Sequence, residues 1–371
     1  MSRHYLDHAS TSPARPEAIA AVTAWMSRPG GDPGRIHAEG LEARVAVEEA
    51  RERVAALFGA RPRSVVFTSG ATEAIAAACW GAAERGSHQV LAAVEHSAVR
   101  KAAEIHGEVT VVGVDEHGRV DPDALLAAVR ADTAVVHLQW GNHEVGTLQP
   151  VAALVAACRE RGVLVHVDAA QANGRVPIAF DEIGADLLSV SSHKLGGPAG
   201  VGALLVRRGL RVRPLLVGGD QERARRAGLE PVALLAGFGA AAEVLAGTLP
   251  AEAAAQRALI ERARQGVAAL DGVREHGHPH DRLPHLLCLG VEGVEPQAVL
   301  LGLDRAGVAA HSGSACSSES LEPSPVLEAM GVDAHHSLRL SVGWSSTEAD
   351  IDAALGALPE VLQHLRSLAA G

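Results

Sequence analysis

The fold of this 371-residue chain is decided by the stretch Ser189-Val190-Ser191-Ser192-His193-Lys194-Leu195-Gly196-Gly197-Pro198. The apolar run from residue 186 to 190 predicts a short buried strand, which the glycines that follow cannot continue. Lys194 therefore stands where a strand leaves a sheet, the place where α/β enzymes bind ligands. Because a lone lysine is more often a solvated loop residue, this interpretation needs support from elsewhere in the chain.

The preceding predicted strand supplies that support. It covers residues 163–167 and ends at Asp168, 26 residues before Lys194. This arrangement suits pyridoxal phosphate (PLP): the lysine holds the aldehyde as a Schiff base, and the aspartate keeps the pyridine nitrogen protonated. Ser191 and His193 are candidates for hydrogen bonds to the phosphate. Gln171 is a candidate donor to the phenolic oxygen of the ring.

Two further loops carry groups of the same predicted site. Thr68-Ser69-Gly70-Ala71-Thr72 lies between a strand and a helix, so its backbone N–H groups and the Thr72 hydroxyl suit a phosphate. Taken alone, such a turn is more often only a capped helix start. His96 follows another strand and is a candidate for stacking on the pyridine ring, although an ordinary surface histidine is the alternative. The prediction rests on four loops that leave the same edge of one sheet.

The order of predicted elements indicates an α/β protein with a second, smaller part. Strands and helices alternate from residue 63 to about 195, which predicts a mostly parallel sheet covered by helices. Long helical segments follow at 232–245 and 251–270, and then strands near 286–291, 308–310 and 338–342. We expect an N-terminal arm over 1–14, a large domain over 15–245, and a small α+β domain over 246–371.

Composition limits the class of protein. Apolar residues make up 47% and charged residues 21% of the chain, which is typical of a soluble enzyme. The net charge of −11 argues against nucleic acid or an anionic membrane as partner. We see no signal peptide and no uncharged apolar run near the ~20 residues of a membrane span. The four cysteines form no C-x-x-C pair, so we expect a cytoplasmic protein without a metal site.

The chain resembles the cysteine desulfurases, PLP enzymes of the class V aminotransferase group with the aspartate-aminotransferase fold. The resemblance covers nearly the whole length, and its motifs occur in family order. They are Tyr5-Leu6-Asp7, Pro13, Gly70-Ala71-Thr72-Glu73, Glu95-His96, Glu144-Val145-Gly146, His166-Val167-Asp168-Ala169-Ala170-Gln171, Ser191-Ser192-His193-Lys194, Gly218-Gly219, Glu222-Arg223, Ser312-Gly313-Ser314-Ala315-Cys316-Ser317 and Arg339-Leu340-Ser341-Val342-Gly343. The fold implied is a large domain with a mostly parallel, seven-stranded-type sheet and a smaller α+β C-terminal domain.

The resemblance also implies an activity and residue roles. L-cysteine would give L-alanine and a persulfide on Cys316, for transfer to a sulfur-acceptor protein in iron–sulfur cluster assembly, tRNA thiolation or biosynthesis. A homodimer is implied as well. The catalytic residues would be Lys194, Cys316 and His96; the cofactor-binding residues would be Ala71, Thr72, His96, His143, Asp168, Gln171, Ser191, His193 and Lys194; the substrate-binding residues would be Arg339 and Asn142.

Four positions depart from the family pattern. His143 replaces an asparagine that contacts the cofactor in the family, and Leu229 replaces a threonine that reaches the neighbouring subunit's phosphate. Ala199 and Asp32 are milder departures. These changes keep two alternatives open: another PLP enzyme on the same scaffold (a selenocysteine lyase, a C–S lyase or an epimerase), and a non-catalytic relative. Retention of Lys194 and Asp168 argues against the non-catalytic relative.

Overall fold

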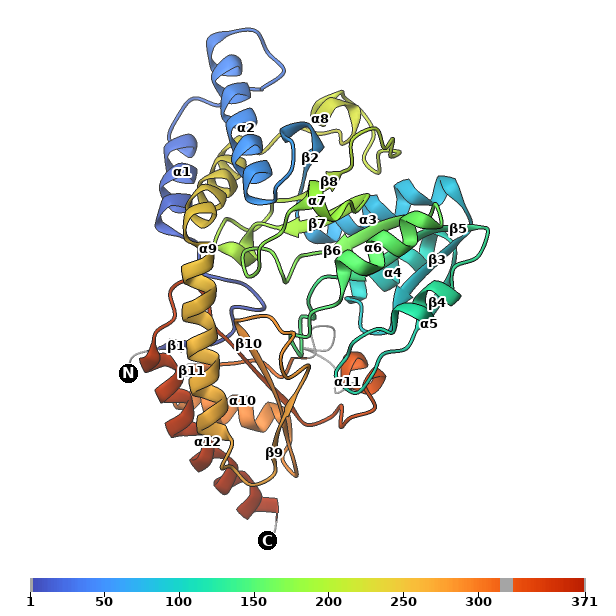
Figure 1. The fold of residues 1–371 in the computed structure, drawn as a ribbon. Helices are drawn as coiled ribbons and strands as arrows, with labels where there is room; N and C mark the ends of the chain where they lie inside the picture. The colour runs from blue at the N-terminus through green and yellow to red at the C-terminus, as the bar shows by residue number, and fades with distance from the viewer. Residues whose placement is uncertain (1–2, 314–322, 370–371) are drawn as a thin grey trace.

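The computed structural model describes residues 3–313 and 323–369. A seven-stranded sheet with the strand order β2-β8-β7-β6-β5-β3-β4 forms its centre (Figure 1). Its strands are β2 (Val65–Thr68), β3 (His88–Ala92), β4 (Glu108–Val112), β5 (Thr133–Gln139), β6 (Leu164–Asp168), β7 (Leu187–Ser191) and β8 (Gly202–Val206). Strand β8 pairs antiparallel with β2 and β7, and the other pairs are parallel. The predicted mostly parallel, seven-stranded sheet is therefore confirmed.

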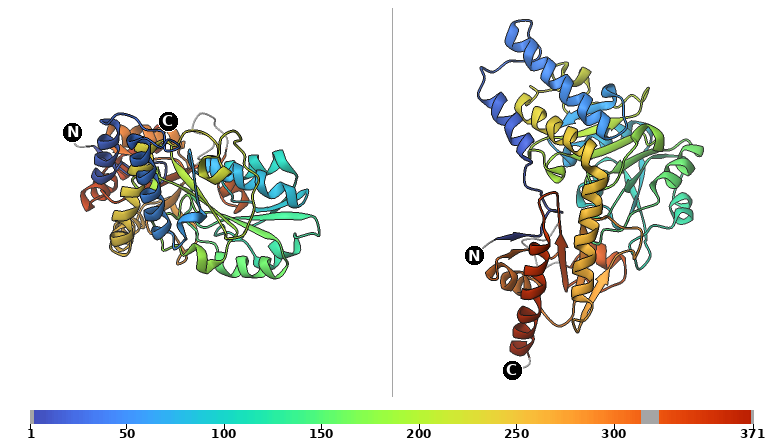
Figure 2. Two further views of the ribbon diagram at one scale, coloured as in Figure 1. Left: turned by 90° about the horizontal axis from the view of Figure 1, so that it is seen from above. Right: turned by 60° about the vertical axis from the view of Figure 1, so that its left-hand side comes forward.

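Helices cover both faces of this sheet, which explains its apolar strands. Helices α3 (Ala71–Ala82) and α4 (Ser97–His106) lie on one face, and α5 (Pro122–Ala127), α6 (Val151–Glu160) and α7 (Phe180–Ile183) lie on the other (Figure 2). Strands buried on both sides read as near-continuous Val and Leu runs. Every residue of β5 to β8 is buried accordingly.

A single long helix, α9 (Val232–Val267), joins the two parts of the molecule (Figure 1). It packs against α1 (Pro16–Met26) and α2 (Ala38–Leu57) near its start and against α12 (Glu348–Ala369) further on. The sequence-based expectation of two helices was wrong, because α9 continues through Pro250. Proline in a helix removes one hydrogen bond, and packing along both halves keeps the helix continuous. Among the described residues α9 alone meets the length and hydropathy criteria for a membrane span, but it packs as a core helix.

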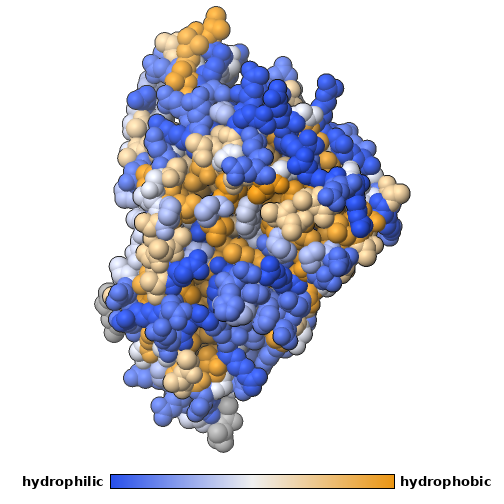
Figure 3. Space-filling model, viewed as in Figure 1, coloured by the Kyte–Doolittle hydropathy of each residue, from blue (hydrophilic) through white to orange (hydrophobic). Residues whose placement is uncertain are grey.

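The C-terminal part is built on an antiparallel sheet with the order β12-β10-β9. These strands are β9 (Val273–His276), β10 (Leu286–Val291) and β12 (Ser337–Ser341), with α10 (Pro296–Arg305) beside them. The N-terminal arm joins this part, because β1 (His4–Tyr5) pairs with β11 (Val308–Ala309). The surface is mostly hydrophilic on the face in Figure 3, with apolar patches between the two parts. The proposed domain boundary at residue 245 falls inside α9 and stays a prediction.

A buried polar row crosses the central sheet beneath the strand ends. Four side chains on four adjacent strands are joined by contacts of 2.8, 2.9 and 2.8 Å: Gln89 on β3, His137 on β5, His166 on β6 and Ser189 on β7. Burial lowers the pKa of His137 to about 3 and that of His166 well below its ordinary value, so both rings are neutral. Asp168 and Ser191 lie two residues further along β6 and β7, on the same face of the sheet.

Candidate active site

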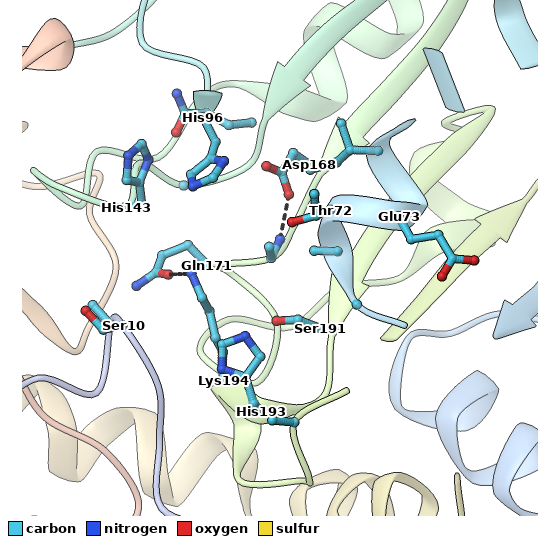
Figure 4. A pocket seen from close by; sticks show the side chains of 18 of the residues that line it. Ser10, Thr72, Glu73, His96, His143, Asp168, Gln171, Ser191, His193 and Lys194 are labelled. Atoms are coloured by element: carbon cyan, nitrogen blue, oxygen red, sulfur yellow. Dashed lines mark hydrogen bonds between the residues drawn. The ribbon is translucent and has the colours of Figure 1, made fainter. Parts of the chain in front are cut away.

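A cavity of about 570 Å³ opens at the carboxyl ends of the central strands (Figure 4). Parallel strands present their exit loops at one edge, so residues far apart in sequence meet there. Ten of the predicted site residues line the cavity: Ala71, Thr72, His96, His143, Asp168, Gln171, Ser191, His193, Lys194 and Arg339. The convergence of these loops is thus observed, while the individual roles stay predictions. Cys316 lies outside the described residues.

Lys194 lies in the short turn His193–Leu195 that follows β7. Its Nζ donates a hydrogen bond to Oε1 of Gln171 at 2.8 Å. Burial, reinforced by the nearby Arg339 guanidinium, lowers the pKa of the Lys194 amine to about 8, although Asp168 opposes the shift. A buried lysine of this kind has a usable fraction of neutral amine near neutral pH, which is the form that attacks an aldehyde.

Asp168 ends β6 and is 7% exposed. Its Oδ1 accepts a hydrogen bond from the Ala170 N–H at 2.9 Å. Burial raises the pKa of this carboxyl group, opposed by that N–H and by the charge of Lys194. A buried carboxylate is stable when it faces a positive or proton-donating partner, and the pyridinium N–H of PLP is such a partner.

The start of α3 and the Ser191 hydroxyl form a cradle for an anion. Helix α3 starts after Gly70 with no side-chain cap, so N–H groups of its first turn are left for a ligand. Ser191 Oγ lines the same cavity, is buried and has no hydrogen-bond partner among the described residues. A buried unpaired hydroxyl next to an uncapped helix start fits a phosphate group.

Glu73 supports this anion cradle. The residue belongs to the Gly70-Ala71-Thr72-Glu73 motif, but the sequence did not indicate its contacts. Its carboxylate accepts the Ser69 N–H at 2.8 Å and pairs with Arg226 at 2.9 Å. The charged pair therefore ties the turn before α3 to the segment that follows α8 (Gln221–Ala224).

Two imidazole rings that line the cavity contact each other (Figure 4). His96 and His143 meet edge to face, with ring centroids 5.0 Å apart and an interplanar angle of 68°. Burial, helped by His143 and then Lys194, lowers the pKa of His96 to about 3. The His96 ring is therefore neutral at physiological pH, as a ring that stacks on a cofactor should be.

Arg339 on β12 brings a guanidinium to the cavity from the C-terminal part. Its Nη1 donates to the His143 carbonyl at 2.8 Å, and its Nη2 donates to Asp7 Oδ1 at 2.9 Å and Ser10 Oγ at 2.8 Å. Nε is buried without a hydrogen-bond partner among the described residues. The guanidinium is thus held in place at the cavity, and a guanidinium suits a carboxylate ligand.

Asn142 requires a correction to the sequence-based assignment. It is fully buried, and its Oδ1 accepts the N–H groups of Glu144 and Val145, each at 2.8 Å. Its Nδ2 donates to Val94 O and Gln139 Oε1. No donor or acceptor is left for a substrate, so Asn142 holds the loop that presents His143. Sequence analysis also missed Ser10, Gln139 and His311 as lining residues.

Comparison with known proteins agrees with this geometry. The model of the class-V aminotransferases matches residues 4–354, and the chain belongs to this PLP-dependent family. Cysteine desulfurase IscS 1 of Archaeoglobus fulgidus is 38% identical over 375 residues, which cover 98% of each chain. A solved NifS-like protein superposes with a TM-score of 0.92 at 30% identity, covering 98% of this chain and 100% of that one. SspA in complex with cysteine gives a TM-score of 0.81 at 28% identity, covering 93% and 100%.

Proposed function

We propose that this chain is a cysteine desulfurase, which removes sulfur from L-cysteine and releases L-alanine. The observation that carries the proposal is that Lys194 and Arg339 line one cavity. An amino-acid substrate needs both an amine-exchanging group and a carboxylate-binding group. The solved relative bound to cysteine and the desulfurase relatives favour L-cysteine as that amino acid.

The residues of the cavity fit PLP and divide its binding among them. Asp168 would face the pyridine nitrogen, His96 would cover the ring and Gln171 would face the phenolic oxygen. Ala71, Thr72, Ser191 and His193 would hold the phosphate, and Lys194 would bind the aldehyde. When bound, PLP withdraws electrons from the carbon atoms of the attached amino acid.

The protein groups then orient the substrate and move its protons. Arg339 fixes the carboxylate, and its contacts to Asp7, Ser10 and the His143 carbonyl keep the guanidinium from turning. The Lys194 amine, with its pKa lowered to about 8, accepts the Cα proton. Cys316 is the proposed nucleophile toward the substrate sulfur and would hold it as a persulfide.

We further propose a cytoplasmic homodimer that passes its persulfide sulfur to an acceptor protein, with iron–sulfur cluster assembly as one destination. A persulfide must be discharged to another thiol before the next turnover, so the chemistry requires an acceptor. Exposed apolar side chains at Leu216, Val217 and Leu229 support burial against a second copy. The presence of His143 in the cavity keeps a selenocysteine lyase, a C–S lyase or an epimerase as the second candidate.

The test uses the purified, PLP-loaded protein and L-cysteine. The wild type should be yellow and release equal amounts of alanine and protein-bound persulfide. Lys194→Ala should lose the covalently held cofactor, as measured after borohydride reduction. Cys316→Ser should keep the yellow cofactor and form no persulfide, while Cys158→Ala, a change at a fully buried cysteine, serves as the matched control. Wild-type desulfuration by Cys316→Ser would refute the assignment in favour of a direct C–S lyase.

A further inference from the structure

Four histidines line the cavity, and three of them are held in the neutral form. His96 Nδ1 accepts the Ala98 N–H at 3.1 Å, His311 Nδ1 accepts the Gly313 N–H at 2.9 Å, and His193 Nδ1 contacts Thr11 Oγ1 at 3.1 Å. Burial lowers the pKa of His96 to about 3 and that of His193 to about 4, and it also lowers the pKa of His311. Burial therefore disfavours the protonated form of all three rings.

His143 is placed differently from these three rings. Its Nε2 lies 3.4 Å from Oε1 of Glu144, and both side chains are buried. The other carboxylate oxygen of Glu144 accepts a hydrogen bond from the Ser324 hydroxyl, and the Glu144 N–H is held by Asn142. Glu144 therefore cannot swing away. A fixed carboxylate beside an imidazole stabilises its protonated form.

The His143 ring is also fixed with respect to the substrate site. Its main-chain carbonyl accepts a hydrogen bond from Arg339 Nη1, so the residue that binds the substrate carboxylate and the His143 backbone are directly joined. The ring contacts that of His96 edge to face, and both residues line the cavity. Among the described residues, Nδ1 of His143 has no hydrogen-bond partner.

We propose that His143, backed by Glu144, is the acid that protonates the substrate carbon after sulfur has left it. This proposal rests on the proposed desulfurase activity. The thiolate nucleophile attacks the substrate sulfur, and its electron pair forms the S–S bond. The C–S bond breaks, and the electron pair of the C–S bond stays on carbon. A C–H bond then forms with the proton of the His143 imidazolium, which becomes neutral, and alanine carries the new methyl group. The step is a proton transfer and requires no oxidant.

The charges around His143 support this assignment over His96. A proton on His143 disfavours one on His96, because the charge of His143 lowers the pKa of His96. The carboxylate of Glu144 lies 3.4 Å from the His143 ring. Burial and the charge of Lys194 also lower the pKa of His96.

The test compares His143→Asn and Glu144→Gln with wild-type PLP-loaded protein. Since an acid in the correct position contributes roughly 10²–10⁴-fold, His143→Asn should lower kcat by about 100-fold or more with KM changed little. Glu144→Gln should also lower kcat, because the carboxylate that lies beside the imidazole is gone. His364→Asn, at an exposed site on α12, is the matched control and should behave as wild type.

A second readout does not depend on turnover. In cofactor-free protein labelled with ¹⁵N-histidine, one imidazole signal that is absent in His143→Asn should shift in Glu144→Gln, because the carboxylate lies beside that ring. The proposal is overturned if His143→Asn keeps the wild-type kcat, or if that signal is unchanged in Glu144→Gln. Failure of the desulfurase assignment looks different, because the wild type itself would then make no alanine and persulfide.

Discussion

The most demanding stability prediction concerns a buried ion pair between Arg51 on α2 and Glu222 on α8. Both side chains are 2% exposed, and two hydrogen bonds of 2.7 and 2.8 Å join the guanidinium to the carboxylate. The same carboxylate accepts the Phe67 N–H at 2.9 Å. Glu222 also begins a run of three non-glycine residues with positive φ, 48° at Glu222 and 59° at Arg223 and Ala224. The ion pair therefore holds a strained turn against β2, an edge strand of the central sheet.

Replacing Glu222 by alanine should be strongly destabilising. The change removes the buried carboxylate partner of Arg51 and leaves only Glu48, whose side chain is 44% exposed; loss of a buried partner costs roughly 3–5 kcal/mol. With an unfolding entropy of about 2.1 cal/mol/K per residue, a chain of this size has about 0.8 kcal/mol/K, so Tm should fall by about 4–6 °C. The pair Arg262–Asp352, with side chains 46% and 50% exposed, is the matched control. Asp352→Ala should cost about 0–1 kcal/mol and about 1 °C.

Scanning calorimetry of the PLP-loaded variants at pH 7.5 measures this difference. The double variant Arg51→Met/Glu222→Leu should recover part of the loss, because it removes the unpaired charge. The reasoning is refuted if Glu222→Ala lowers Tm no more than Asp352→Ala. It is also refuted if the double variant is less stable than Glu222→Ala.

Three further predictions follow from the site. Glu73→Gln weakens the hydrogen bonds to Ser69 and Arg226, so the PLP dissociation constant should rise about ten- to a hundredfold. This factor is equivalent to the loss of a charge-assisted hydrogen bond of about 1.5–3 kcal/mol. Equal PLP affinity of variant and wild type in a fluorescence titration would contradict the prediction. In folded Cys316→Ser protein, no thiol should react quickly with Ellman's reagent at pH 8. Burial raises the pKa of Cys79 to about 12, that of Cys158 to about 11 and that of Cys288 to about 12. All three thiols should react after unfolding. Attachment of PLP to cofactor-free protein should accelerate up to pH about 8 and level off above it, because the neutral Lys194 amine reacts and its pKa is about 8; a rate that keeps rising toward pH 10 would indicate an unshifted lysine.

Local patterns predicted most of the large sheet and failed where an element depends on distant packing. Buried Val and Leu runs marked β5, β6 and β7 to within a residue or two. Strand β8 was missed because it starts with glycine after a glycine-rich loop, and only its pairing with β2 and β7 defines it. The edge strand β9 was missed because it is polar and partly exposed. Pro250 indicated a break, yet contacts on both sides preserve α9.

The cavity-lining residues were predictable because strand ends meet at one edge, whereas their supporting contacts were not. Nothing in the sequence says that Asp7 and Ser10 hold Arg339, since these residues are more than 300 positions away in the chain. Asn142 was given a substrate role from the family resemblance, but its amide bonds to its own loop and to Val94 and Gln139. Hydrogen-bond partners depend on side-chain directions that a motif does not encode.

The hydrogen bonds of the buried polar row beneath the site all point in one direction, from Ser189 to Gln89. Each neutral imidazole offers one N–H and one bare nitrogen, so Ser189 donates to His166, His166 donates to His137, and His137 donates to the Gln89 oxygen. Turning the Gln89 amide by 180° would exchange the donor and the acceptor of every hydrogen bond along the row. Its Nε2 has no hydrogen-bond partner in the described part of the chain, so one amide on β3 sets the tautomers of two histidines below the catalytic strand ends.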